Sequence, residues 1–320
     1  MHSRSTQLLR GGLLALLAAA GAYGCGSSSS TSTLSTPATL TTASRTPGTG
    51  KPPVTLATKN FTEQLILGQL YAQALRAKGF KVTLKSDVGA SEVVNRKLAA
   101  GEIDGYPEYT GTILSVVAHQ SVRPASAQEA YSRAAAFERS RGRTLLAMSP
   151  ATDTNVVVAK PTYAAQHRLR SLADLTRLDA SATLAGPPEF RTRFSGLVGL
   201  RQAYRVSRLR FLPVKIGTQY RALADGRAQL ATVFTTDGNL SEGGFTLLAD
   251  PKNIFGFQNI TFVLRRSVLA REGPAFAATI NSVSSKLSTQ ALRVMNAAVD
   301  LDQQSPAAVA RQFLGANGLS

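Results

Sequence analysis

The apolar and polar positions from residue 54 onward predict strands separated by helices. A short apolar run at 54–58 leads through a polar loop into residues 62–78, where apolar side chains recur at helical spacing. A half-buried strand at 81–85 follows, and then a helix that starts at Ser91 and stops at Gly101. This order predicts an open α/β sheet, and in such sheets ligands bind where strand ends meet helix N-termini.

The residues at the two ends of the helix at 62–78 are candidate caps. Asn60 with Glu63, or Thr62 alone, offers side chains that cap a helix N-terminus. Gly79 suits the C-terminus. We therefore expect these polar residues to hold the loop that enters the helix.

The same alternation continues along the rest of the chain. Further strands are predicted at 103–106, 145–149, 156–160, 182–185, 210–214, 230–234, 246–249 and 262–264. Further helices are predicted at 110–117, 128–141, 161–167, 195–203, 220–225, 274–287, 289–298 and 306–314. Pro107 is expected to break its strand because proline has no N–H to donate. Ser305 and Pro306 suit the start of the last helix.

The pattern starts again after about Asp153, which indicates two lobes. Residues 53–153 and 257–320 are predicted to form one lobe, and residues 154–256 a second lobe inserted into it. The chain would then pass between the lobes twice, and the two crossing strands would act as a hinge.

The first 25 residues are typical of a bacterial export signal. Arg4 and Arg10 give a basic start, and residues 13–20 form a short apolar core. Cys25 is the only cysteine, so no intrachain disulfide is expected, and its position resembles the lipid-modified cysteine of bacterial lipoproteins. Residues 26–52 are rich in Ser, Thr, Pro and Gly and are predicted to form a flexible tether. We therefore expect an exported protein held at the outer face of the cell membrane, with ordinary cleavage and a secreted or periplasmic protein as the alternative.

The chain is strongly basic, with a net charge of +17, or +15 once Arg4 and Arg10 leave with the signal. Nucleic acid is the first partner that such a charge suggests. The export signal, the spread of basic residues along the chain and the absence of known nucleic-acid-binding signatures count against it. Attraction to anionic lipid or cell-wall polymer, and no specific consequence, both stay open.

Several short motifs are distributed along the mature chain. Thr58–Gln64 reads TKNFTEQ, GEID at 101–104 precedes YPEYTGT at 106–112, and Thr235–Gly238 reads TTDG. Together with the ending at 308–319, these motifs resemble the osmoprotectant-type substrate-binding proteins of ABC importers, which bind glycine betaine, carnitine and choline. The resemblance covers about residues 54–319.

This resemblance implies a type II periplasmic-binding-protein fold, an α/β architecture with two lobes, a hinge and a ligand cleft between the lobes. It implies an extracytoplasmic solute-binding protein that delivers a quaternary amine or zwitterion to an ABC permease, while a separate ATPase supplies the energy. No cofactor is implied, and a monomer is the default. A sensory or cell-wall-associated binding protein on the same scaffold, without import, is the alternative.

The resemblance also implies an aromatic cage around the cation of the ligand, since quaternary ammonium is attracted to ring faces. Tyr109 matches a cage tyrosine, and Phe234 keeps a ring where the family often has tyrosine. Asn155 stands where many members have tyrosine, and Leu197 lies near another such position. The sequence therefore predicts a cage that is only partly aromatic.

Polar side chains and backbone N–H groups are expected to hold the carboxylate of the ligand. Gln64 and Thr112 match family positions with this role, and Lys59 and Asn60 lie beside them. Each of these residues also has a structural explanation, as a helix-start residue or a surface charge. We expect the N–H groups of the helix that starts near Tyr109 to attract an anion.

Charged residues offer further contacts. Arg191 and Arg193 flank a loop at a strand end, where an arginine fork would suit a carboxylate. Asp237 is a candidate ligand contact and a candidate helix cap. Glu108, Asp153 and Asp237 are hypothesised to supply negative charge to a cation in place of missing rings.

Catalysis has little support in the sequence. Only His119 and His167 remain after signal removal, and no nucleophile elbow, zinc-protease or phosphate-loop motif is present. We predict no catalytic and no metal site. An envelope hydrolase with a carboxylate pair in the cleft stays as a second alternative.

Overall fold

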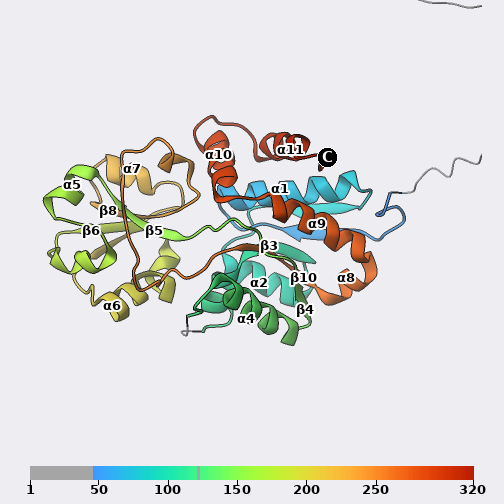
Figure 1. Cartoon of the computed structure of the whole chain (residues 1–320), viewed down its shortest axis with the longest axis horizontal. Helices are drawn as coiled ribbons and strands as arrows, with labels where there is room; N and C mark the ends of the chain where they lie inside the picture. Colours follow the sequence, from blue (N-terminus) through green and yellow to red (C-terminus); the bar gives the residue numbers. More distant parts are fainter. Residues whose placement is uncertain (1–45, 121–122) are drawn as a thin grey trace, which may run out of the picture. The chain divides into compact units, whose positions relative to one another are not determined.

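The computed structural model describes residues 46–120 and 123–320, in which the strands form two five-stranded sheets (Figure 1). The first sheet has the order β2-β1-β3-β10-β4, made of β1 Val54–Ala57, β2 Val82–Lys85, β3 Gly105–Tyr109, β4 Arg143–Leu145 and β10 Ile260–Arg265. The second sheet has the order β7-β6-β8-β5-β9, made of β5 Asn155–Ala159, β6 Thr183–Gly186, β7 Arg210–Pro213, β8 Leu230–Phe234 and β9 Thr246–Leu248. We call the first sheet with its helices lobe 1 and the second lobe 2. The predicted export signal, Cys25 and residues 26–45 of the predicted tether lie outside the described residues.

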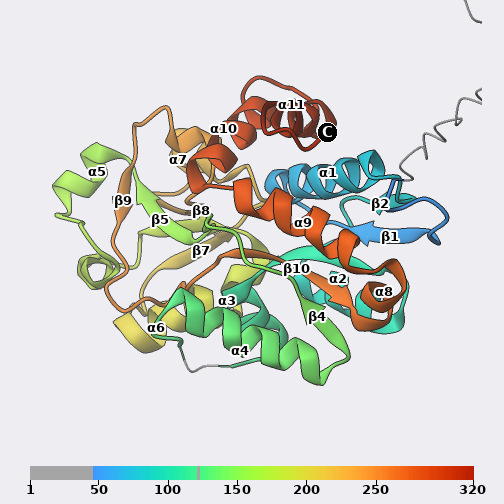
Figure 2. The same cartoon turned by 45° about the vertical axis from the view of Figure 1, so that its right-hand side comes forward.

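Helices cover both faces of the first sheet. Lobe 1 carries α1 Thr62–Ala77, α2 Ser91–Ala100, α3 Thr110–Thr112, the π-helix η1 Ile113–Val117, α4 Ala127–Ser140, α8 Arg266–Glu272, α9 Pro274–Lys286, α10 Thr289–Asp300 and α11 Pro306–Ala316. Lobe 2 carries α5 Pro161–Gln166, η2 Leu172–Arg177, η3 Pro188–Arg191, η4 Phe194–Val198, α6 Gly199–Tyr204, α7 Gln219–Ala224 and η5 Gly238–Leu240. Helices α1 and α9 lie on one face of the first sheet, and α2 and α4 on the other (Figures 1 and 2). Among the described residues, none of the helices has the length and apolar character needed to cross a membrane.

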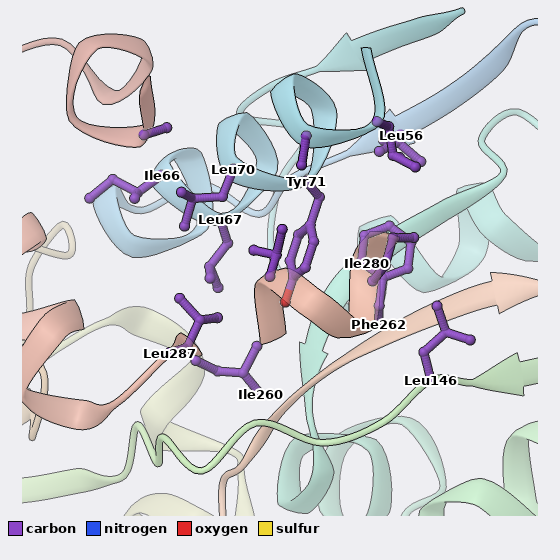
Figure 3. Packing of buried hydrophobic residues seen from close by; sticks show 14 of the residues in the cluster. Leu56, Ile66, Leu67, Leu70, Tyr71, Leu146, Ile260, Phe262, Ile280 and Leu287 are labelled. Carbon is purple, nitrogen blue, oxygen red and sulfur yellow. The ribbon is translucent and has the colours of Figure 1, made fainter. Parts of the chain in front are cut away.

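The apolar side of α1 forms the core of lobe 1. Ile66, Leu67, Leu70 and Tyr71 are buried against the first sheet (Figure 3). The Tyr71 ring meets the edge of Phe262 on β10, with the ring centroids 5.1 Å apart. Burying each of the three aliphatic side chains, Ile66, Leu67 and Leu70, contributes about 1.5–3 kcal/mol. Strand β1 pairs in parallel with β2, so the strand–helix–strand unit predicted from the hydrophobic pattern is present.

The prediction that Pro107 breaks its strand was wrong. Pro107 lies inside β3 and pairs with β10. Alternate residues donate in an antiparallel pair, and the N–H of Thr110 donates to the carbonyl of Asn259 at 3.0 Å. The nitrogen of Pro107 therefore faces the β1 side, where pairing stops at Leu56 and Gly105. The missing N–H costs no ladder hydrogen bond at this position.

The predicted N-cap of α1 was also wrong. Phe61 occupies the cap position, and no side chain bonds to the start of the helix. The Thr62 hydroxyl donates instead to Oδ1 of Asp300 at 2.6 Å, and Glu63 accepts from the Tyr109 hydroxyl at 2.7 Å. These long-range partners outcompete the local cap.

Three smaller differences come from tertiary contacts. Helix α8 was not predicted, and the strand expected at 145–149 already ends at Leu145. The helix expected at 195–203 begins as η4, with Ser195 and Gly196 in non-helical conformations. At Gly196 a Cβ would lie 2.2 Å from a backbone carbonyl oxygen, so only glycine fits there.

Two antiparallel segments connect the lobes. Thr152 and Asn259 form an isolated bridge, and the N–H of Asp153 donates to the carbonyl of Gln258 at 3.1 Å. One segment enters β5 and the other enters β10. The sequence predicts a hinge at two crossings, and both the lobe boundaries and the hinge motion stay predictions.

Residues 46–52 contact lobe 1, although their composition assigns them to the tether. The N–H of Gly48 donates to the carbonyl of Lys78 at 2.8 Å, and Nζ of Lys51 donates to the carbonyl of Arg271 at 2.9 Å. Composition does not detect these contacts because both of them end on backbone carbonyls of residues distant along the chain.

Candidate functional site

Residues from both lobes line a cavity that holds about 630 Å³ of empty space, including space open to solvent. We call it the interlobe cavity. Its lining is Lys59, Asn60, Phe61, Ala90, Ser91, Tyr109, Thr112, Asp153, Asn155, Pro187, Glu189, Phe190, Arg193, Ser195, Ile216, Phe234 and Gln258. Most of these residues lie at strand ends or in the loops that follow, as the α/β architecture predicts.

Three aromatic rings lie in a row along the interlobe cavity. The Phe61 ring is nearly parallel to both neighbours, with its centroid 5.5 Å from Phe234 and 6.4 Å from Tyr109. Phe61 comes from the start of α1, Tyr109 from the end of β3 and Phe234 from the end of β8. The row therefore joins the two lobes, and its ring faces attract cations.

Lys59 is a buried cation beside these rings. Its ammonium pairs with the buried carboxylate of Glu108 and lies 4.1 Å from the ring centroid of Tyr109. Burial lowers the pKa of Lys59, and the charge of Glu108 opposes that shift. The positive charge of Lys59 is thus balanced within lobe 1.

The backbone at the start of α3, predicted to attract an anion, already has internal partners. The N–H and the hydroxyl of Thr112 both donate to Oε1 of Gln258, at 3.0 and 3.2 Å. The N–H of Tyr109 donates to Oε1 of Glu108 at 3.0 Å. Gln258 is in turn held by the carbonyl of Phe255. A side-chain amide of this chain therefore occupies the predicted carboxylate position.

Gln64 is buried behind the interlobe cavity rather than in its wall. Its Nε2 donates to the Tyr109 hydroxyl at 3.2 Å, and its Oε1 accepts from the N–H of Lys59 at 3.4 Å. The Tyr109 hydroxyl donates to Glu63, whose pKa is raised by burial. Gln64 and Glu63 thus orient the Tyr109 ring.

Asp153 and Glu189 bring negative charge to the interlobe cavity. Asp153 is buried, and its Oδ1 accepts from the Thr236 hydroxyl at 2.8 Å. Burial raises the pKa of Asp153 well above its usual value, and the carboxylate of Glu63 raises it further. Neither Asp153 nor Glu189 forms an ion pair with a described residue. Both carboxyl groups are therefore available to a ligand.

The two candidate arginines differ in their positions. Arg193 lines the interlobe cavity, and its Nη2 lies 2.9 Å from Oε2 of Glu92 at the start of α2. The guanidinium of Arg191 lies over the ring of Phe211, 5.5 Å from its centroid, and does not line this cavity. The structure therefore favours Arg193 over the predicted Arg191 as a ligand contact.

Asp237 lines a neighbouring cavity between the start of α1, α10 and η5, which we call the α1–η5 cavity. Its carboxylate accepts from the Tyr220 hydroxyl at 3.0 Å and from the N–H of Phe234 at 3.2 Å. It makes no cap hydrogen bond to η5, so the predicted cap was wrong. Asp237 supports the end of β8 from behind the ring row.

Six of the nine predicted ligand contacts line the interlobe cavity: Lys59, Asn60, Tyr109, Thr112, Asn155 and Phe234. Their role in binding stays a prediction. Gln64, Arg191 and Asp237 do not line it, and Leu197 is buried in the core of lobe 2. Sequence reasoning missed Phe61, Glu189 and Gln258. Only Phe61 carried a usable signal, because it is the aromatic residue within the motif at 58–64.

The part of the chain that the structure describes contains no group of His, Cys, Asp and Glu side chains suited to hold a metal ion. The interlobe cavity combines ring faces, the ion-paired Lys59 and Arg193, two carboxyl groups without a basic partner, and amide and hydroxyl side chains. Such a set is suited to hold a small charged molecule.

Comparisons with known proteins agree with this geometry. A family model described as the substrate binding domain of an ABC-type glycine betaine transport system (OpuAC) matches residues 52–316. A glycine-betaine-binding protein from Pseudomonas aeruginosa is 32% identical over 269 residues, which cover 80% of this chain and 85% of that protein. The glycine betaine-binding protein YehZ from Escherichia coli is 28% identical over 278 residues, 83% of this chain and 91% of that protein.

Solved structures support the fold. The structure of apo YehZ superposes with a TM-score of 0.62 at 27% identity, covering 84% of this chain and 99% of that one. A structure titled glycine betaine/carnitine/choline ABC transporter has a TM-score of 0.68 at 22% identity and covers 83% of this chain and 99% of that one. The two-lobe type II periplasmic-binding-protein fold that the sequence predicts is confirmed.

Proposed function

This chain belongs to the family of substrate-binding domains of ABC-type glycine betaine transport systems, and we propose that its interlobe cavity binds a small osmoprotectant amine for import. Family membership makes the protein an extracytoplasmic solute-binding component of an ABC importer that works with permease subunits, and not an enzyme. The hydrolase alternative is thereby set aside. The proposal concerns which solute is bound, and where.

The row formed by Phe61, Tyr109 and Phe234 carries the proposal. These rings come from both lobes and line the interlobe cavity with spacings of 5.5 and 6.4 Å. Ring faces attract organic cations without requiring a hydrogen bond, so they suit ammonium groups that carry methyl groups. The two similar proteins described above are glycine-betaine-binding proteins.

Calorimetry on the purified protein tests this proposal. The panel holds glycine betaine, choline, carnitine and, as controls, neutral and acidic amino acids. We expect binding of at least one quaternary amine, and a loss of about 3- to 30-fold in affinity for Phe61→Ala, because one cation–π contact is worth about 0.5–2 kcal/mol. Phe313→Ala, on α11 and away from the cavity, is the matched control and should keep the affinity. Binding of amino acids only would contradict the proposal.

We also propose that 53–153 with 257–320, and 154–256, move as two lobes about the double connection at Thr152 and Asn259. The antiparallel pairing there supports a hinge of two strands. Small-angle scattering with and without a bound ligand tests it. An unchanged scattering profile on saturation would contradict the hinge.

For localisation, we propose a monomer attached to the outer face of the membrane through a lipid on Cys25. The basic and apolar start of the chain and the position of its one cysteine support this. Labelling with a fatty-acid analogue in cells tests it, and Cys25→Ala should abolish the label. Label that persists in this variant would contradict the assignment.

A further inference from the structure

The interlobe cavity has an unequal supply of partners for positive and negative ligand groups. We propose that it prefers an organic cation without a carboxylate, with Asp153 facing the positive charge, over a zwitterion such as glycine betaine. The inference rests on the proposed function, because it concerns the ligand of the same cavity. Three sets of contacts lead to it.

The first set is the polar groups that would hold a carboxylate. The N–H and hydroxyl of Thr112 donate to Gln258 at 3.0 and 3.2 Å, and the N–H of Thr110 donates to the carbonyl of Asn259 at 3.0 Å. Gln64 is satisfied within lobe 1 and does not line the cavity. A ligand carboxylate could therefore be held by these groups only if it displaced their existing hydrogen bonds.

The second set is the basic side chains. Lys59 and Arg193 are the lysine and arginine in the wall of the interlobe cavity, as far as the structure describes it. Each is paired with a carboxylate outside that wall, Lys59 with Glu108 and Arg193 with Glu92. Their charges are compensated, so neither leaves a net positive field for an anion.

The third set is the acidic side chains of the wall. Asp153 has one oxygen that accepts from Thr236, and its second oxygen accepts no hydrogen bond from the described residues. Glu189, on η3 of lobe 2, has no ion-pair partner among them either. Of the three carboxylates hypothesised from sequence to replace missing rings, Asp153 lines this cavity, whereas Glu108 is paired with Lys59 and Asp237 lines the neighbouring cavity.

The balance of charge follows from these contacts. With both basic groups paired, Asp153 and Glu189 are the acidic residues of the wall that have no ion-pair partner among the described residues. A cation gains attraction from both carboxylates and from the rings, and it lets Asp153 ionise. A carboxylate on the ligand would gain neither attraction, and it would be repelled by each of these two groups that is ionised. Specificity here comes from repulsion as well as attraction.

Choline and glycine betaine form a matched pair of probes, because both carry a trimethylammonium group. Choline has a hydroxymethyl group at the position where glycine betaine has its carboxylate. In calorimetry on the purified protein, we expect choline to bind at least about 10-fold more tightly than glycine betaine. Asp153→Asn should weaken choline at least about 10-fold and narrow the difference between the two ligands. Glu189 is half-buried, and Glu189→Gln should act in the same direction. Asp225→Asn, an exposed carboxylate outside the cavity, is the control for charge alone.

Each outcome decides the inference. Glycine betaine binding as tightly as choline, or more tightly, would overturn it and leave the proposed function standing. Unchanged choline affinity in both Asp153→Asn and Glu189→Gln, with melting temperatures near that of the wild type, would also overturn it. If Asp153→Asn fails to fold, the wild-type ligand pair and Glu189→Gln decide alone. Absence of binding by any amine in the panel would refute the proposed function itself, and the inference with it.

Discussion

The guanidinium of Arg193 in lobe 2 binds the carboxylate of Glu92 in lobe 1, with Nη2 2.9 Å from Oε2 and 3.1 Å from Oε1. Arg193 also lines the interlobe cavity, so this pair ties the lobes together next to the proposed ligand. The side chains are 22% and 39% exposed, which limits the strength of the pair. We infer that this ion pair helps to hold the two lobes together around the ligand.

We predict that Glu92→Gln weakens ligand affinity up to about 5-fold, because an exposed ion pair contributes about 0.2–1 kcal/mol. The loss should lie in the dissociation rate and shrink at high salt. Stopped-flow binding at low and high ionic strength measures both. Glu102→Gln breaks a similarly exposed pair with Lys97 within lobe 1 and should change neither rate. Equal changes of the dissociation rate in Glu92→Gln and Glu102→Gln would show that the pair with Arg193 does not hold the lobes together.

A second prediction concerns the buried pair of Lys59 and Glu108. Lys59→Met should lower the free energy of unfolding by about 3–5 kcal/mol, because it leaves Glu108 charged and buried without a partner. Adding Glu108→Gln to this variant should restore part of the loss. Urea unfolding measures both. A single variant as stable as the wild type would contradict a contribution of this ion pair to stability.

A third prediction concerns pH. Burial raises the pKa of Asp237 from its usual value of 3.8 to about 7. The hydrogen bonds from the N–H of Phe234 and the hydroxyl of Tyr220 act in the opposite direction and lower this pKa. Between these two values the folded protein keeps a proton that the unfolded chain has released. The free energy of unfolding should therefore fall as pH rises through this window, by at most about 1.4 kcal/mol per pH unit, and level off above it.

Urea unfolding at pH 5 and pH 8 checks this expectation. The difference between the two pH values should shrink in Asp237→Asn, which carries no charge at either. It should not vanish, because burial also raises the pKa of Glu63 and Asp153. The exposed Asp225→Asn should leave the difference unchanged. If Asp237→Asn keeps the full pH dependence of the wild type, Asp237 does not cause the fall in the free energy of unfolding.

A fourth prediction concerns the contact of η5 with α10. At Gly238 an added Cβ would lie 2.4 Å from the Cα of Ala297, so backbone would have to move. Gly238→Ala should therefore cost about 1–3 kcal/mol of stability. Gly315→Ala, in the helix α11 with open space around it, should instead add about 0.5–1 kcal/mol. Thermal unfolding of the two variants separates crowding from helix propensity. If Gly238→Ala leaves the stability unchanged, the backbone at this contact has room for an added methyl group.

The sequence predicted the alternation of strands and helices because hydrophobic period is a local property. Strands β5, β6, β7 and β8 and helices α1, α2 and α4 lie within one or two residues of their predicted bounds. The cap of α1 was missed because partners far along the chain replace the local hydrogen bonds. The place of Pro107 inside a strand was missed because its nitrogen faces the side of β3 where pairing with β1 has stopped, so no local N–H is needed.

The sequence by itself also determined which loops reach the cavity, because strand ends of one sheet meet at one edge and the motif residues follow those ends directly. Only the tertiary structure decided which of these side chains are still free to bind. Thr112 is satisfied by Gln258, 146 residues away, and Arg193 by Glu92, 101 residues away. No spacing along the chain indicates such partners, because only the fold brings them within hydrogen-bond distance. The lack of a basic partner at Asp153 and Glu189 is therefore a property of the folded protein and not of any motif.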